Sequence, residues 1–126
     1  MPYNLLRVTF VETEIFTRIV HDYLTDDEYA ELQSFLAAYP EAGDLIQASG
    51  GVRKLRWRMK NSGKRGGLRV IYYLRTHVGE IWLLTLYSKA VRETIPTHVL
   101  RAIREAIEHG HCDQTRYRTG DSGRDS

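Results

Sequence analysis

Two stretches with period-two patterning, joined by a glycine-rich segment, constrain this chain more than any other feature. In the first, three large apolar residues alternate with four cations: Leu55, Trp57 and Met59 with Lys54, Arg56, Arg58 and Lys60. The second, Leu68 to Arg75, is rich in β-branched and aromatic residues. Successive side chains of a strand point to opposite faces. The pattern therefore predicts a hairpin with one apolar face and one row of cations.

Charge is strongly segregated along the 126 residues, although the formal net charge is only +2. Residues 1–44 hold two basic and nine acidic side chains, residues 45–79 hold nine basic and no acidic ones, and residues 80–126 hold seven of each. A row of like charges repels itself, and no nearby acidic residue in the sequence relieves it. We therefore expect a local site for RNA or DNA phosphates, with a solvated strand face as the alternative.

The N-terminal third predicts a strand followed by two helices. Residues 6–11 alternate as a strand does. From Glu14 onward, apolar residues recur at helical spacing. Thr25 and Glu28 have the spacing of a capping box, which begins a second helix that Pro40 ends. This part of the chain is therefore expected to form a helical hairpin.

The C-terminal half predicts three neighbouring strands and a last helix. Ile81–Tyr87 is nearly all apolar, which is typical of a central strand covered on both faces. Pro96 and Gly110 bracket the helix. The expected fold is α+β: a small, four-stranded antiparallel sheet with the helical hairpin on one face and a C-terminal helix. Residues 1–110 would form one domain, and residues 111–126, poor in apolar side chains, a disordered tail.

Other sequence features limit the class of protein. The single cysteine, Cys112, excludes an internal disulfide and suits a reducing compartment. The chain shows no signal peptide and no long apolar run, so we expect a cytoplasmic protein without a membrane partner. No HExxH motif occurs, and His109, His111 and Cys112 lie at a helix end before the tail, so neither a metal nor another cofactor is predicted.

Three segments together resemble one protein family: GGVRKLRWRMKNSGKRGGLRVIYYL, the preceding YPEAGDLIQASGG and the following IWLLTLYSK. They resemble the RelE/ParE superfamily of bacterial type II toxins, and most of all its HigB branch, over most of residues 8–109. The resemblance implies a RelE-like fold and a ribosome-dependent endoribonuclease that cuts messenger RNA in the ribosomal A site. It also implies a cognate, HigA-like helix-turn-helix antitoxin, which alone would bind operator DNA.

The resemblance assigns basic residues position by position. It places the two basic positions of the second strand on Lys54 and Arg56, the arginine opening the third strand on Arg69, and the basic residue after the fourth strand on Lys89. RelE proteins often have a second basic residue after that lysine, and here Ala90 occupies the position. This departure leaves the general acid unassigned.

The chemistry of RNA cleavage suggests roles for these residues. Without a metal, a base removes the proton of the 2′-hydroxyl, cations stabilise the phosphorane and an acid protonates the leaving 5′-oxygen. Arginine keeps its proton and cannot be the base, whereas lysine can when neighbouring cations lower its pKa. The candidate catalytic residues are Lys54 as base, beside Arg53 and Arg56; Arg56 and Arg69 as phosphate clamp; and Lys89 or Tyr87 at the leaving group. Further RNA or ribosome contacts are predicted for Arg53, Arg58, Lys60, Lys64, Arg65, Tyr73 and Arg75.

Two other functions remain open at this point. One is a ParE-like toxin that poisons DNA gyrase without cutting RNA. The other is a non-catalytic nucleic-acid-binding module. The cationic row with Lys54, Arg56 and Arg69 favours the ribonuclease over both.

Overall fold

The computed structural model describes residues 8–58, 67–88 and 95–110, and the backbone of 115–119. These residues form an α+β structure. Its elements in chain order are β1 (Thr9–Thr13), α1 (Glu14–Tyr23), α2 (Asp26–Ala38), β2 (Asp44–Leu45), β3 (Val52–Trp57), β4 (Leu68–Arg75), a 3-10 turn (Thr76–Val78), β5 (Glu80–Ser88), α3 (Thr97–Glu108) and β6 (Thr115–Thr119).

The strands form one mixed sheet in the order β2-β3-β4-β5-β1-β6. β1 runs parallel to β5, and the other neighbouring pairs are antiparallel. The prediction of four strands, all antiparallel, was therefore wrong in strand number and in the direction of β1. Phe10 and Val11 are both fully buried, in the cores on opposite faces of the sheet, and β1 lies between β5 and β6 rather than at an edge. Periodicity identifies a strand but not its neighbour.

The edge strand β6 lies where the sequence predicted a disordered tail. Residues 115–119 pair antiparallel with the whole of β1, from Thr9↔Thr119 to Thr13↔Thr115. This pairing occupies the backbone hydrogen-bonding groups that β1 would otherwise expose at the edge of the sheet. The rest of the predicted tail lies outside the described residues.

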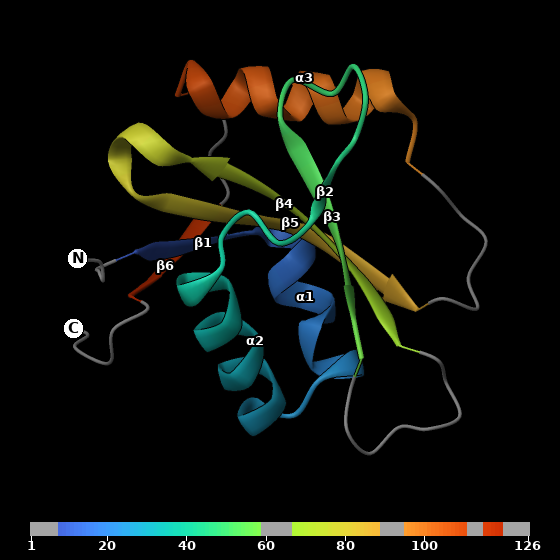
Figure 1. Ribbon diagram of the computed structural model, residues 1–126, viewed down its shortest axis with the longest axis vertical. Coiled ribbons are helices and arrows are strands. Elements are labelled where there is room, and N and C mark those ends of the chain that lie inside the picture. The colour runs from blue at the N-terminus through green and yellow to red at the C-terminus, as the bar shows by residue number, and fades with distance from the viewer. Residues whose placement is uncertain (1–7, 59–66, 89–94, 111–114, 120–126) are drawn as a thin grey trace.

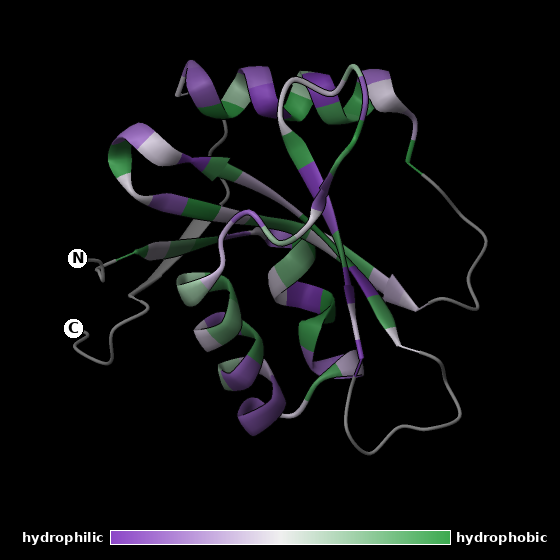
Figure 2. Cartoon of the chain, viewed as in Figure 1, coloured by the Kyte–Doolittle hydropathy of each residue, from purple (hydrophilic) through white to green (hydrophobic). Residues whose placement is uncertain are grey.

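Helices cover both faces of the sheet (Figure 1). The face under α1 and α2, the hairpin face, carries a core that includes Phe10, Leu55 and Tyr72. The face under α3, the α3 face, carries a second core that includes Ile71 and Trp82. Figure 2 shows hydrophilic and hydrophobic residues alternating along α3, as an amphipathic helix requires. The central position predicted for Ile81–Tyr87 is confirmed, because β5 lies between β4 and β1.

The predicted helix boundaries rest on specific hydrogen bonds. The Thr13 hydroxyl accepts a hydrogen bond from the Phe16 backbone N–H and caps α1. The capping box at α2 is confirmed: Glu28 N–H donates to the Thr25 hydroxyl, and Thr25 N–H donates to the Glu28 carboxylate. Both α1 and α2 therefore begin where their first-turn donors find side-chain acceptors.

Tyr72 ties the segment between α2 and β3 to the sheet. Its buried hydroxyl accepts a hydrogen bond from Gly43 N–H at 2.9 Å and donates one to the Pro40 carbonyl at 2.7 Å. A Cβ on Gly43 would lie 2.9 Å from the Tyr72 ring, so the segment packs closely against it. Tyr72 therefore sets where the chain enters β2 and β3.

We expect Tyr72→Phe to lower the free energy of unfolding by about 1–3 kcal/mol, because it leaves the buried Gly43 N–H without an acceptor. Burial raises the pKa of the Tyr72 phenol above its ordinary 10.0 and outweighs the hydrogen bond from Gly43 and the nearby Arg53, which lower it. The unfolded chain therefore loses this proton first, and stability falls as the pH rises above 10.0. Urea unfolding at pH 7 to 11 measures both effects, and Tyr72→Phe should show a weaker alkaline loss. Equal loss in both proteins would contradict this account.

Candidate nucleic-acid interface

Strand pairing gathers four of the five predicted catalytic residues at one end of the sheet. Arg56 of β3 pairs directly with Arg69 of β4, and Arg69 pairs with Tyr87 of β5. Lys54 lies two residues before Arg56 and pairs with Ile71. Paired residues share a face, so all four side chains belong to the α3 face. We call Lys54, Arg56 and Arg69 the cationic cluster.

Tyr87 reaches this face because of a bulge in β5. Ile71 pairs with Thr85 but Tyr72 pairs with Leu83, so one extra residue of β5 lies opposite this step of β4. Leu83 packs in the core of the hairpin face. Without the bulge, every second residue after Leu83 would point to the same face, and Tyr87 would lie there too. The extra residue reverses the alternation, and Tyr87 packs against the core of the α3 face instead.

A tight turn before β3 and a close backbone approach after it hold the strand in register. Before the strand, the buried Ser49 hydroxyl donates to the Ile46 carbonyl at 2.7 Å and accepts from Val52 N–H at 2.9 Å. After it, Gly67 begins the return with a φ of +100°, and a Cβ there would lie 2.9 Å from the Trp57 carbonyl oxygen. A side chain at Gly67 would therefore disturb the approach of β4 to β3 and the Arg56–Arg69 pairing.

The cationic cluster has no internal counter-ion among the described residues. No described carboxylate forms an ion pair with Lys54, Arg56 or Arg69. Asp44 of β2 is paired with Lys54 in the strand register, yet the two side chains form no ion pair. The sequence did not predict this carboxylate beside the site, because a strand of two residues is too short to show a period-two pattern.

We expect Arg69→Thr to raise the free energy of unfolding by about 0.2–1 kcal/mol, because Arg56 and Arg69 are like charges directly opposite each other. The gain should shrink in high salt, which screens the repulsion. Urea unfolding at low and high ionic strength measures it. Arg56→Thr serves as the matched variant, and the double variant should gain less than the sum of the two, since one repulsion is removed only once. A destabilised Arg69→Thr at low salt would contradict the argument.

Three residues predicted to contact RNA or the ribosome have intramolecular partners away from the cationic cluster. The Arg53 guanidinium donates to the Glu41 and Gly43 carbonyl oxygens, at 3.2 and 2.7 Å. Arg53 belongs to the hairpin face, because it pairs with Tyr72. It directly precedes Lys54 in β3, but the two side chains lie on opposite faces of the sheet. Tyr73 and Arg75 share the α3 face, but they bind residues of α3 and β5.

Tyr73 and Arg75 anchor the C-terminal end of α3. The Tyr73 hydroxyl donates to the Glu108 carboxylate. Arg75 donates to Glu80 at 2.9 Å, and its Nε lies 3.5 Å from Glu108. The hydrogen bond from Tyr73 is the main cause of the lowered pKa of Glu108, while burial is the main cause of the raised pKa of Tyr73. This network fixes α3 over the sheet at the end away from the cationic cluster.

The remaining predicted contacts fall at or beyond the edge of what the structure describes. Arg58 follows β3 directly and is exposed. Lys60, Lys64, Arg65 and Lys89 lie outside the described residues, so Lys89 stays a prediction from the resemblance.

A cleft of about 320 Å³ opens between the α3 face and α3, next to the cationic cluster. Its lining residues are Ile46, Lys54, Ile71, Tyr87, Ile95, Pro96, Thr97 and Leu100. Sequence reasoning found Lys54 and Tyr87 but missed the rest, since they are ordinary apolar and helix-start residues whose common position depends on how α3 docks. The cleft places an apolar surface beside a cationic one.

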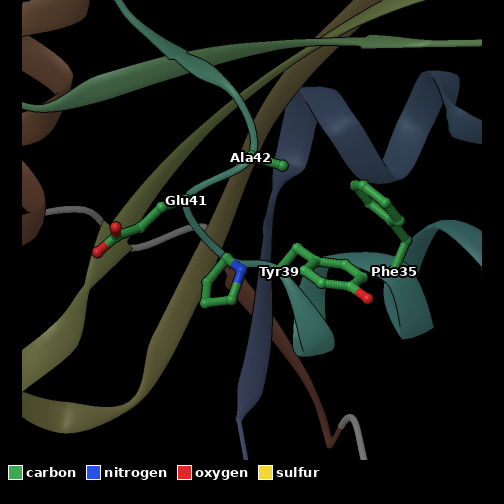
Figure 3. A pocket seen from close by; sticks show the side chains of 5 residues that line it. Phe35, Tyr39, Glu41 and Ala42 are labelled. Atoms are coloured by element: carbon green, nitrogen blue, oxygen red, sulfur yellow. The ribbon is translucent and has the colours of Figure 1, made fainter.

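A second hollow lies on the other side of the sheet. It has a volume of about 510 Å³ and is lined by Phe35, Tyr39, Pro40, Glu41 and Ala42 (Figure 3). The ring centroids of Phe35 and Tyr39 lie 5.2 Å apart. The hollow shares no lining residue with the cleft or with the cationic cluster, so it is separate from the candidate site.

No protein-family model matches the chain. Among the residues described, no three His, Cys, Asp or Glu side chains come together as metal ligands would. Over the same ranges, no helix combines the length and apolar character that crossing a bilayer demands. What characterises the site is therefore its own geometry: three cations and a tyrosine beside an apolar cleft.

Proposed function

We propose that this protein is a ribosome-dependent endoribonuclease of the RelE/HigB type, the toxin of a type II toxin–antitoxin pair with a RelE-like fold. One observation carries the proposal: Lys54, Arg56, Arg69 and Tyr87 share one face, with no described carboxylate ion-paired to the three cations. An RNA phosphate would relieve the repulsion that the pairing of Arg56 with Arg69 creates. The segments GGVRKLRW and LRVIYYL, which resemble those toxins, support the same assignment.

In this proposal the residues divide the work of one in-line displacement. Lys54, in its neutral form, takes the proton of the 2′-hydroxyl, whose oxygen attacks the adjacent phosphorus. Arg56 and Arg69 stabilise the charge that builds on the phosphorane oxygens. The bond to the 5′-oxygen breaks, and Tyr87 or Lys89 protonates that oxygen. The products are a 2′,3′-cyclic phosphate and a free 5′-hydroxyl.

The open position of the site supports a requirement for the ribosome. Arg56 is exposed, and Lys54, Arg69 and Tyr87 are only half-buried, so these side chains do little by themselves to hold a flexible strand in an in-line geometry. The translating ribosome would supply that geometry. By the same resemblance, we expect a helix-turn-helix antitoxin as the partner that neutralises the protein and binds operator DNA.

A purified translation system tests this function. We expect cuts within the A-site codon when messenger RNA is on ribosomes, and at least a hundredfold slower cutting of the same RNA alone, since positioning contributes factors of this size. Mapping of transcript 5′ ends measures both. Equal cutting of free RNA would contradict the ribosome requirement. Intact messenger RNA in this system, together with chromosomal DNA breaks when the gene is induced in cells, would favour gyrase poisoning.

A further inference from the structure

We propose that the cleft between the α3 face and α3 receives one unpaired nucleobase of the bound RNA, and that it sets the base preference of the protein. This inference rests on the proposed function, because it takes the anchored ligand to be an RNA strand. The cleft, and not the cationic cluster, would then distinguish one sequence from another, since phosphate contacts carry no sequence information.

The position of the cleft relative to the cationic cluster supports this inference. Lys54 belongs to both, because it lines the cleft and lies two residues from Arg56 on β3, roughly 6.5 Å along the strand. Tyr87 also lines the cleft and pairs with Arg69. A phosphate on the arginine pair therefore places its own or the neighbouring base at the mouth of the cleft.

The size and lining of the cleft fit a base. Its volume of about 320 Å³ lies near the lower end of the range for small-molecule sites, about 300 to 1,000 Å³. Ile71 and Leu100 supply apolar walls, and the half-buried Tyr87 ring supplies an aromatic one. Stacking on such a ring recognises unpaired bases. A base already stacked inside a duplex cannot enter between a sheet and a helix, so the cleft selects single strands.

Binding of short, uncleavable RNA tests the cleft without relying on catalysis. The probes are fluorescent 2′-O-methyl trinucleotides, in which each base in turn is replaced by an abasic residue, and anisotropy measures their affinity. We expect one position at which losing the base weakens binding about tenfold or more. We call the dissociation constant of the abasic probe divided by that of the intact probe the abasic ratio. Thr97→Trp, which fills the cleft from its rim, should reduce this ratio to near one. Ile46→Trp should do the same and guards against a folding defect in the first variant.

Two control variants separate the cleft from its surroundings. His98→Trp places the same side chain on the neighbouring, exposed residue of α3, which does not line the cleft, and should keep the wild-type ratio. Arg69→Ala should weaken intact and abasic probes equally. The cleft proposal is overturned if folded Thr97→Trp and Ile46→Trp keep the wild-type ratio, if no base matters, or if the wild-type protein binds no probe.

The outcome also separates this inference from the proposed function. If the protein cuts messenger RNA on ribosomes but binds all abasic probes as tightly as the intact probe, the ribonuclease proposal holds and the cleft proposal fails. Base-dependent binding without cutting on ribosomes would keep the cleft as an RNA site and remove the ribonuclease.

Discussion

Lys54→Ala and Lys54→Arg are both expected to slow messenger RNA cleavage on ribosomes by about 10²- to 10⁴-fold and to abolish growth arrest on induction. Arginine preserves the positive charge at this position but keeps its proton, so it cannot accept one from the 2′-hydroxyl. The paired substitutions therefore separate a base from a phosphate clamp. Single-turnover cleavage at saturating ribosomes measures the effect on the chemical step.

The arginines of the cationic cluster should respond differently. Arg69→Lys should retain more activity than Arg69→Ala, because lysine preserves the positive charge, although it cannot form the bidentate hydrogen bonds of a planar guanidinium. Arg101→Ala removes an exposed cation of α3 and serves as the matched control, with activity unchanged. Circular dichroism establishes that each variant is folded. If Lys54→Arg cleaves as fast as the wild type, Lys54 is not the base; if Lys54→Ala and Arg69→Ala both stay fully toxic, the site assignment fails.

The largest effect on stability is expected for Leu32→Ala, at about 2–5 kcal/mol of unfolding free energy. Leu32 is fully buried in the core between α2 and the hairpin face, and its removal leaves a cavity that this close packing cannot fill. Chemical unfolding followed by tryptophan fluorescence measures the loss.

Leu45→Ala is the matched control, because it makes the same chemical change at a β2 residue that is 60% exposed. Its cost should be within about 0.5 kcal/mol. Similar losses for the two variants would mean that α2 does not pack on the sheet as described. The comparison also separates a general loss of stability from a loss of activity, since neither residue belongs to the cationic cluster.

Local chemistry made much of the fold predictable. The capping box of Thr25 and Glu28, the stop at Pro40 and the helix between Pro96 and Gly110 each depend on neighbours in sequence, and the structure has all of them. The two faces of β4 were also predictable, because Tyr72 and Tyr73 enter opposite cores as strict alternation requires. The parallel pairing of β1 and the strand at residues 115–119 were not, since both depend on partners far away in the chain.

The candidate site divides in the same way. Period-two alternation placed Lys54 and Arg56 on one face of one strand, and Arg69 on a defined face of the next, because side-chain direction along a strand is a local property of the backbone. The pairing of Arg56 with Arg69 depends on hairpin register, Tyr87 joins them only through the bulge in β5, and the cleft exists only where α3 docks. Such features arise from backbone hydrogen bonds and packing between distant segments. The sequence by itself therefore determined which residues are cations on which strand face, and the tertiary structure alone decided which of them meet.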